Sequence, residues 1–183
     1  SSERGQSLIE VIVAATVGIL VVSALTFATI FSLRNAGFAK NSAQATKLAQ
    51  EGIERVRTGR DRNSRITISG VSVNSWSGTQ PIWSYQITAP QGCDNPSIGK
   101  CYFNVDSASG ELTNNPFGFA LTSFPDSPPA EKISSVNQTF QRVVTLSDEA
   151  TTFTNQKTVT VIVRWNDFAG PHESKLITIL RKL

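Results

Sequence analysis

The sequence lacks most of the residue types from which enzymes build active sites. Its 183 residues include one histidine, His172, and two cysteines, Cys93 and Cys101. Two cysteines without a nearby histidine cannot supply the four ligands of a structural zinc site. His172 follows Pro171 in a turn-like sequence, so we expect it to be a simple surface residue. Without a motif for a nucleophile, a metal or a phosphate group, the sequence predicts neither an enzyme nor a cofactor or metal site.

Methionine, proline and charge are also missing over long stretches. There is no methionine, so Ser1 is not an initiator residue, and no proline occurs between Gln6 and Thr79. Val11–Leu33 contains no charged side chain over 23 residues. A helix of that length spans about 35 Å, enough for a hydrocarbon core of ~30 Å. Its aliphatic and Phe side chains contribute roughly 4–8 kcal/mol to insertion, more than the penalty of about 2.5–3.5 kcal/mol for one carboxylate.

Three interpretations of this apolar segment remain open at this point. A cleaved secretory signal has a shorter apolar region that ends in a small-x-small site, and Thr26–Ala28 matches that site poorly. A plain signal anchor would carry Glu10 by accident, although acids at membrane depth are rare without a function. The third interpretation is a membrane helix in which Glu10 has a role.

The residues before the apolar run favour this third interpretation. Residues 5–10 read Gly-Gln-Ser-Leu-Ile-Glu, and ahead of a long apolar helix this sequence resembles the processing site of type IV prepilins and pseudopilins. The resemblance implies that a membrane peptidase cuts after Gly5 and methylates the new amino terminus of Gln6. Residues 1–5 would be the end of a leader, and Glu10 would be the charge used in filament assembly. Gln6 departs from the family, which usually has Phe or another large apolar residue there.

The helix is predicted to continue past the apolar segment, over residues 34–58. Ala, Lys, Gln, Glu and Arg, which favour helix, dominate this part. Thr58 and Gly59 predict the end of the helix. Small or apolar residues recur at steps of three or four, so that one narrow face can lie against a sheet; they are Phe38, Ser42, Ala45, Ala49, Ile53 and Val56.

Residues 59–183 change to the two-residue period of β-strands. Asn166–Pro171 predicts a tight turn, and Asn114–Pro129 predicts a long surface loop. A helix followed by antiparallel strands predicts an α+β fold, with the long N-terminal helix packed on a C-terminal antiparallel sheet as in pilins. The predicted strands are residues 65–73, 83–87, 101–105, 140–146, 158–165 and 175–180.

The last three of these strands resemble the closing strands of minor pilins. Together with the processing site, this implies a structural subunit of a type IV pilus; a type II secretion pseudopilin and a DNA- or surface-binding competence pilin are the alternatives. The expected partners are other pilin subunits, the prepilin peptidase, the inner-membrane assembly platform and, before assembly, the lipid bilayer. The subunit would cross the inner membrane once and later belong to an extracytoplasmic pilus.

The distribution of cations conflicts with that topology. Arg34, Lys40 and Lys47 follow the apolar segment, whereas Arg4 precedes it beside Glu3. Because Lys and Arg favour the cytoplasmic side, this pattern alone would place the large domain in the cytoplasm.

Cys93 and Cys101 bear on the same question. They enclose seven residues, and in an extracytoplasmic domain an isolated pair at this spacing favours a disulfide. Two unrelated buried thiols are the alternative.

Basic residues concentrate at the predicted end of the helix. Residues 34–65 carry a net charge of +5 and residues 66–183 a net charge of −1. A dense cluster is a candidate contact for a polyanion such as DNA, for acidic lipid or for an acidic neighbouring subunit. A solvated helix end, with Glu51, Glu54 and Asp61 as ion-pair partners, is the alternative, and no aromatic residues interleave with the cations as a single-strand platform requires. The cluster consists of Arg55, Arg57, Arg60, Arg62 and Arg65.

Overall fold

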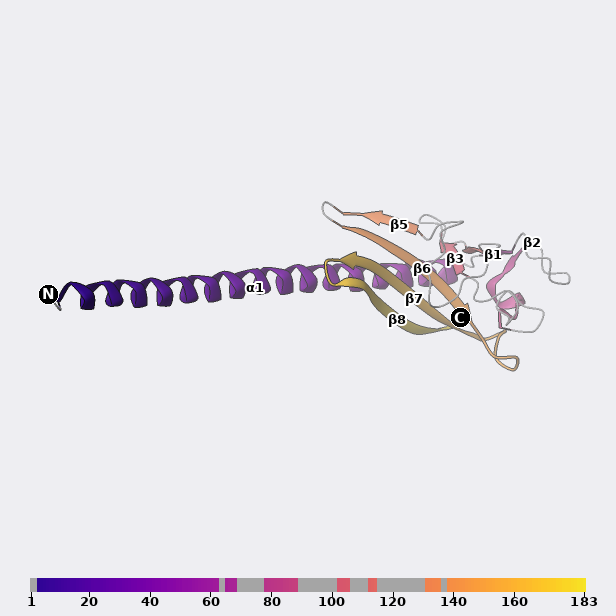
Figure 1. The fold of residues 1–183 in the computed structure, drawn as a ribbon. Helices are drawn as coiled ribbons and strands as arrows, with labels where there is room; N and C mark the ends of the chain where they lie inside the picture. The colour runs from indigo at the N-terminus through magenta and orange to yellow at the C-terminus, as the bar shows by residue number, and fades with distance from the viewer. Residues whose placement is uncertain are drawn as a thin grey trace. The chain divides into compact units, whose positions relative to one another are not determined.

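The computed structural model has an α+β architecture, with one long helix and an eight-stranded sheet among the residues described (Figure 1). The chain divides into two compact units, Ser1–Lys40 and Asn41–Leu183, and helix α1 (Glu3–Asp61) contributes to both. The described residues are 3–62, 65–68, 78–88, 102–105, 112–114, 131–135 and 138–183.

The predicted end of the helix is wrong, because α1 continues through Thr58 and Gly59 to Asp61. The Thr58 hydroxyl donates to the carbonyl oxygen of Glu54 at 2.9 Å, so it is satisfied inside the helix. The backbone N–H of Arg62 donates to the carbonyl oxygen of Thr58 at 3.1 Å. Gly59 is buried in this last turn. Gly59 therefore lies inside the helix and does not mark its end.

The sheet has the strand order β2-β1-β4-β3-β6-β7-β8, and β5 also pairs with β6. The strand pairs are antiparallel except β1 with β4, which run parallel. This one pair departs from the predicted antiparallel sheet, because β2 and β3 intervene in sequence and the chain returns in the same direction. The strands are β1 (Arg65–Ile68), β2 (Gly78–Pro81), β3 (Tyr102–Val105), β4 (Leu112–Asn114), β5 (Glu131–Ser134), β6 (Thr139–Ser147), β7 (Gln156–Asp167) and β8 (Gly170–Arg181).

The predictions for β6, β7 and β8 are confirmed, whereas the strand predicted over residues 83–87 is wrong. Ile82–Ser84 is a 3-10 helix, η1, and Tyr85–Ile87 is irregular. Apolar side chains of this segment still enter the core. The alternation in the sequence therefore indicated that these side chains are buried, and it did not indicate a strand. Strand β5 was not predicted, because Ile133 is its one apolar residue. Residues 115–129 of the predicted loop lie outside the described residues.

A tight turn joins β7 and β8, as the sequence predicted. Asp167 pairs with Gly170, which leaves Phe168 and Ala169 as the two loop residues. Gly170 has a φ of +117°, which L side chains rarely adopt. The glycine is therefore required at this position of the hairpin.

The core of Asn41–Leu183 lies between α1 and one face of the sheet. From Ala45 onward, the predicted face of α1 is buried there, and Ala45 and Ala49 are 0 % exposed. Phe38, which was predicted to lie on the same face, is 42 % exposed. Gly52 allows a close approach of α1 to the sheet, because a Cβ atom at this position would lie 2.9 Å from Cγ1 of Val161 on β7. On the sheet, this core includes Phe140, Val144, Leu146, Val159, Val161, Val163 and Trp165.

Candidate assembly site

The first part of α1 presents an almost continuous apolar surface. Leu8, Val11 and Leu33 are 63 %, 65 % and 68 % exposed, and the large side chains between them are exposed as well. Within the described part of the chain, α1 is the one helix long and apolar enough to cross a membrane. This exposure has a cost in water, since apolar surface is stabilised by removal from water. The surface is therefore suited to lipid or to other apolar helices.

Four hydroxyl groups of this segment donate to backbone carbonyl oxygens of the same helix. Thr16 donates to the carbonyl oxygen of Val13 at 2.9 Å. Ser23, Thr26 and Thr29 donate to carbonyl oxygens one turn earlier at 2.8 Å. In hydrocarbon, an unsatisfied hydroxyl costs several kcal/mol, of order 4–8. These internal bonds make the surface compatible with a bilayer although it contains Ser and Thr.

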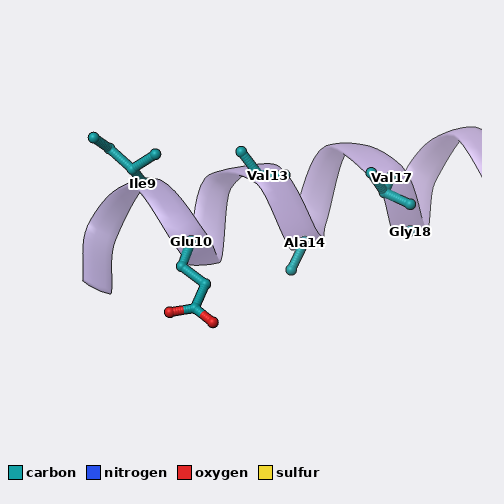
Figure 2. Close-up of a pocket in the computed structure, with 6 residues that line it drawn as sticks. All are labelled: Ile9, Glu10, Val13, Ala14, Val17 and Gly18. Atoms are coloured by element: carbon teal, nitrogen blue, oxygen red, sulfur yellow. The ribbon is translucent and has the colours of Figure 1, made fainter. Parts of the chain in front are cut away.

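Glu10 is the exception on this surface. Figure 2 shows its carboxylate and Ala14 on one side of the helix, opposite Ile9 and Val13. These side chains, with Val17 and Gly18, line a shallow apolar recess. Glu10 is exposed, and among the described side chains no cation forms an ion pair with it. The carboxylate is therefore available to a cation from outside the described side chains.

The other residues of the processing sequence are described only in part. Gly5 and Gln6 belong to the first turns of α1, but their side chains are outside the described set. Cys93 and Cys101 lie outside the described residues, so their pairing stays a prediction.

The arginine cluster forms ion pairs with acids of its own helix. Arg57 contacts Glu54 at 2.6 Å, and Arg60 contacts Asp61 at 2.7 Å. These are partners that the sequence suggested for a solvated helix end.

Arg55 lies between two carboxylates, Glu51 at 2.6 Å and Glu131 at 3.4 Å. Arg65 begins β1, and its side chain is not described. Arg62 also interacts within the chain. Contact of this cluster with DNA or another polyanion stays a prediction.

Arg142 on β6 is a buried cation that the sequence analysis missed. Its side chain is 1 % exposed, and two of its guanidinium nitrogens donate to the Glu131 carboxylate at 2.8 Å. A third donates to the carbonyl oxygen of Leu48 in α1 at 2.9 Å. Arg142 thus joins α1, β5 and β6. Its signal in the sequence is its position, since it alternates in phase with Phe140 and Val144, which face the core.

Lys157 on β7 is a second buried cation that the sequence analysis missed. It is in phase with Val159 and Val161, which face the core. Its side chain and that of Asp148 are both 0 % exposed, and their charged atoms are 2.5 Å apart. Burial lowers the pKa of Lys157, and the opposing effect of the Asp148 carboxylate is smaller. This pair therefore belongs to the interior of the domain and not to a surface site.

His172 is not the simple surface residue that the sequence predicted. It stacks on Trp165 with the ring centres 5.4 Å apart, and its Nε2 lies 2.8 Å from the Asp167 carboxylate. Partial burial opposes ionisation of Asp167, but the N–H of Ala169 and the His172 ring outweigh it and lower the pKa of Asp167. The β7–β8 turn therefore fixes His172 by a ring contact and a polar contact.

Comparison with known proteins identifies no relative of this chain. The chain matches no family model, no curated protein and no solved structure.

Proposed function

We propose that the chain is a minor pilin, a structural subunit that assembles into a type IV pilus through α1. The observation that carries this proposal is the carboxylate of Glu10 on an otherwise apolar, exposed helix surface. An intramembrane acid needs a partner, and a helix with such a surface needs lipid or other helices around it. Residues 5–10 resemble prepilin processing sites, and this resemblance implies both. The cleaved amino terminus would be the partner of the acid, and the helices of other subunits would surround the apolar surface.

The proposed mechanism is transfer of α1 from lipid to the apolar centre of a filament. Cleavage after Gly5 creates a positively charged amino terminus at Gln6, one helical turn from Glu10. Pairing of Glu10 with that amino terminus, its own or a neighbour's, offsets the cost of burying either charge alone. Because the pair forms in one relative position of two subunits, it can also set their register.

Two related functions use the same helix. A pseudopilin of a type II secretion system would assemble by the same chemistry into a different machine. A competence pilin would add binding of DNA through the arginine cluster, and the ion pairs of Arg57 and Arg60 with their neighbouring acids do not favour this addition.

Processing can be tested by co-expression of the chain with a prepilin peptidase. We expect the intact mass of a chain that begins at N-methylated Gln6. Gly5→Val should prevent the cut, because the resemblance places the peptidase at this glycine. A wild-type chain cut near Ala28, or one left uncut, would contradict the pilin proposal.

The role of Glu10 can be tested by fractionation between membrane and sheared filament. Glu10→Ala and Glu10→Gln should enter the membrane at least as well as the wild type, because a penalty of about 2.5–3.5 kcal/mol is removed. Both should be depleted from filaments, because the amino terminus loses its buried counter-charge at a cost of about 3–5 kcal/mol.

Ile12→Ala is the matched control, since it trims the same exposed surface and keeps the charge. Equal amounts of wild type and both Glu10 variants in the filament would show that Glu10 is not an assembly residue.

The location of the domain can be tested through Cys93 and Cys101. If residues 41–183 lie outside the cytoplasm, both cysteines should be oxidised to each other in protein from cells lysed with thiol-blocking reagent present. Alkylation of both without prior reduction would instead support the cytoplasmic placement that the Lys and Arg distribution suggests.

A further inference from the structure

Lys157 and Asp148 form a fully buried ion pair that the proposed assembly function does not use. The Lys157 ammonium donates to the Asp148 carboxylate at 2.5 Å and to the carbonyl oxygen of Tyr85 at 2.6 Å. The ring of Phe153 lies 5.7 Å from the same nitrogen. The ammonium is thus held between the β6–β7 connection and the segment that follows η1.

Asp148 also binds this segment, and its carboxylate accepts hydrogen bonds from the backbone of the segment. The N–H groups of Ile87 and Thr88 each donate to an Asp148 carboxylate oxygen at 2.9 Å. In return, the backbone N–H of Asp148 donates to the Thr88 hydroxyl at 3.3 Å. With the bond from Lys157 to Tyr85, the pair contacts three of the four residues of segment 85–88.

These contacts replace the strand pairing that segment 85–88 mostly lacks. Tyr85 and Gln86 have no regular secondary structure, and Ile87 lies in a bend. A buried N–H without an acceptor is costly, so the N–H of Ile87 depends on the Asp148 carboxylate. That carboxylate is in turn fully buried and depends on Lys157 for its counter-charge. Attachment of the segment therefore depends on a charge pair more than on a β-ladder.

The scaffold beneath the pair is built differently. Strands β6, β7 and β8 pair continuously over their length, and β7 carries Val159, Val161 and Val163 into the core. Such ladders open with a free energy near that of global unfolding, whereas segments with few ladder bonds open more easily.

We propose that Lys157 and Asp148 are a charge-dependent clasp: it fastens Tyr85–Thr88 to the β6–β7 hairpin, and its release lets this segment open while β6–β8 stay folded. The clasp is a local conformational device of the domain. It does not rest on the pilin proposal, and a failure of either leaves the other standing.

Amide hydrogen exchange of the full chain in detergent micelles tests the clasp. Lys157→Met keeps a long side chain and removes the charge. It should accelerate exchange at Ile87 and Thr88 at least about 100-fold, because one partner of a buried pair is lost. Exchange at Val161 should remain much slower than at Ile87 and Thr88 in the variant as in the wild type, because the ladder there opens only near global unfolding. Lys175→Met, on the exposed face of β8, is the matched control and should change neither.

Two outcomes would overturn the clasp: equal opening free energies at Thr88 and Val161, which indicate one cooperative unit, or no acceleration of exchange at Ile87 and Thr88. If Lys157→Met does not fold, exchange of the wild type at increasing low denaturant decides the question. Ile87 and Thr88 should then open at lower free energy than Val161. Identical opening free energies would refute the clasp.

Discussion

The two parts of helix α1 carry opposite kinds of surface. Between Leu8 and Leu33 the large apolar side chains are exposed, whereas between Ala45 and Val56 small or medium side chains are buried against the sheet. Small residues allow the helix to approach β7 closely, and large ones would prevent it. The small apolar residues therefore mark the face that packs on the sheet of the same chain. The large apolar residues mark the face that is left for lipid or other helices.

The carboxylates of the chain show the same contrast. Glu131 holds the buried guanidinium of Arg142 and so stabilises the contact of α1 with β5 and β6. Glu10 is exposed and forms no ion pair with a described side chain. Removal of a carboxylate that stabilises the fold should lower the free energy of unfolding. Removal of a carboxylate without a described partner should leave it unchanged.

The largest effect is expected for Glu131→Ala. It leaves the Arg142 guanidinium, 1 % exposed, with the Leu48 carbonyl and a distant Glu51 at 3.8 Å. A fully buried pair would lose about 3–5 kcal/mol; because Glu131 is 40 % exposed, we expect about 2–3 kcal/mol after this discount for solvent. Urea unfolding of the full chain in micelles measures the loss.

Glu10→Ala and Glu54→Ala are the controls for this experiment. Glu54 is 63 % exposed in its pair with Arg57, so its removal should cost less than about 1 kcal/mol. Glu10→Ala should not change the unfolding free energy of residues 41–183. A similar loss for all three variants would erase the distinction between the two kinds of carboxylate.

A smaller effect is expected for glycine substitutions in the two parts of α1. Gly52→Ala places a Cβ atom 2.9 Å from Val161, a stiff β-branched neighbour. Overpacking costs about 1–3 kcal/mol, and the helix propensity of Ala returns up to about 1 kcal/mol, so we expect a net loss of about 1–2 kcal/mol.

Gly18→Ala meets nothing within 4 Å and should leave unfolding of residues 41–183 unchanged. The same urea titration compares both variants. A neutral or stabilising Gly52→Ala would show that β7 can move away from the helix at no cost.

Much of this fold could be predicted from the sequence because its strongest signals are periodic. The small-residue face through Ala49 and the alternation of β7 follow from a period that burial imposes. The apolar run before Arg34 is recognised by its length without a charge. The segment after Pro81 was mispredicted because Tyr85 and Ile87 are buried without a strand. Alternation records burial, and it does not record hydrogen-bond partners.

The charged residues of the interior were harder to predict. Arg142 and Lys157 are in phase with core residues, which is visible in the sequence, but their partners Glu131 and Asp148 come from other elements. Which acid meets which cation depends on strand order, and sequence periodicity does not determine strand order. Glu10 was found for the opposite reason, since an acid before a long apolar run needs no partner to be noticed.

The smallest effect is expected at the β7–β8 turn, far in sequence from both parts of α1. The pKa of Asp167 is lowered in the folded chain, because the N–H of Ala169 and the His172 ring outweigh its partial burial. A group whose folded pKa lies below the unfolded value of about 3.9 stabilises the fold above that value and loses this contribution as pH falls through the folded pKa. Asp167→Asn removes the titration and keeps an oxygen that can accept from Ala169. The wild type should therefore be more stable than the variant at pH 7, and the difference should shrink when the urea titration is repeated near pH 3. A difference that stays constant between the two pH values would show that the hydrogen bonds of Asp167 matter and that its charge does not.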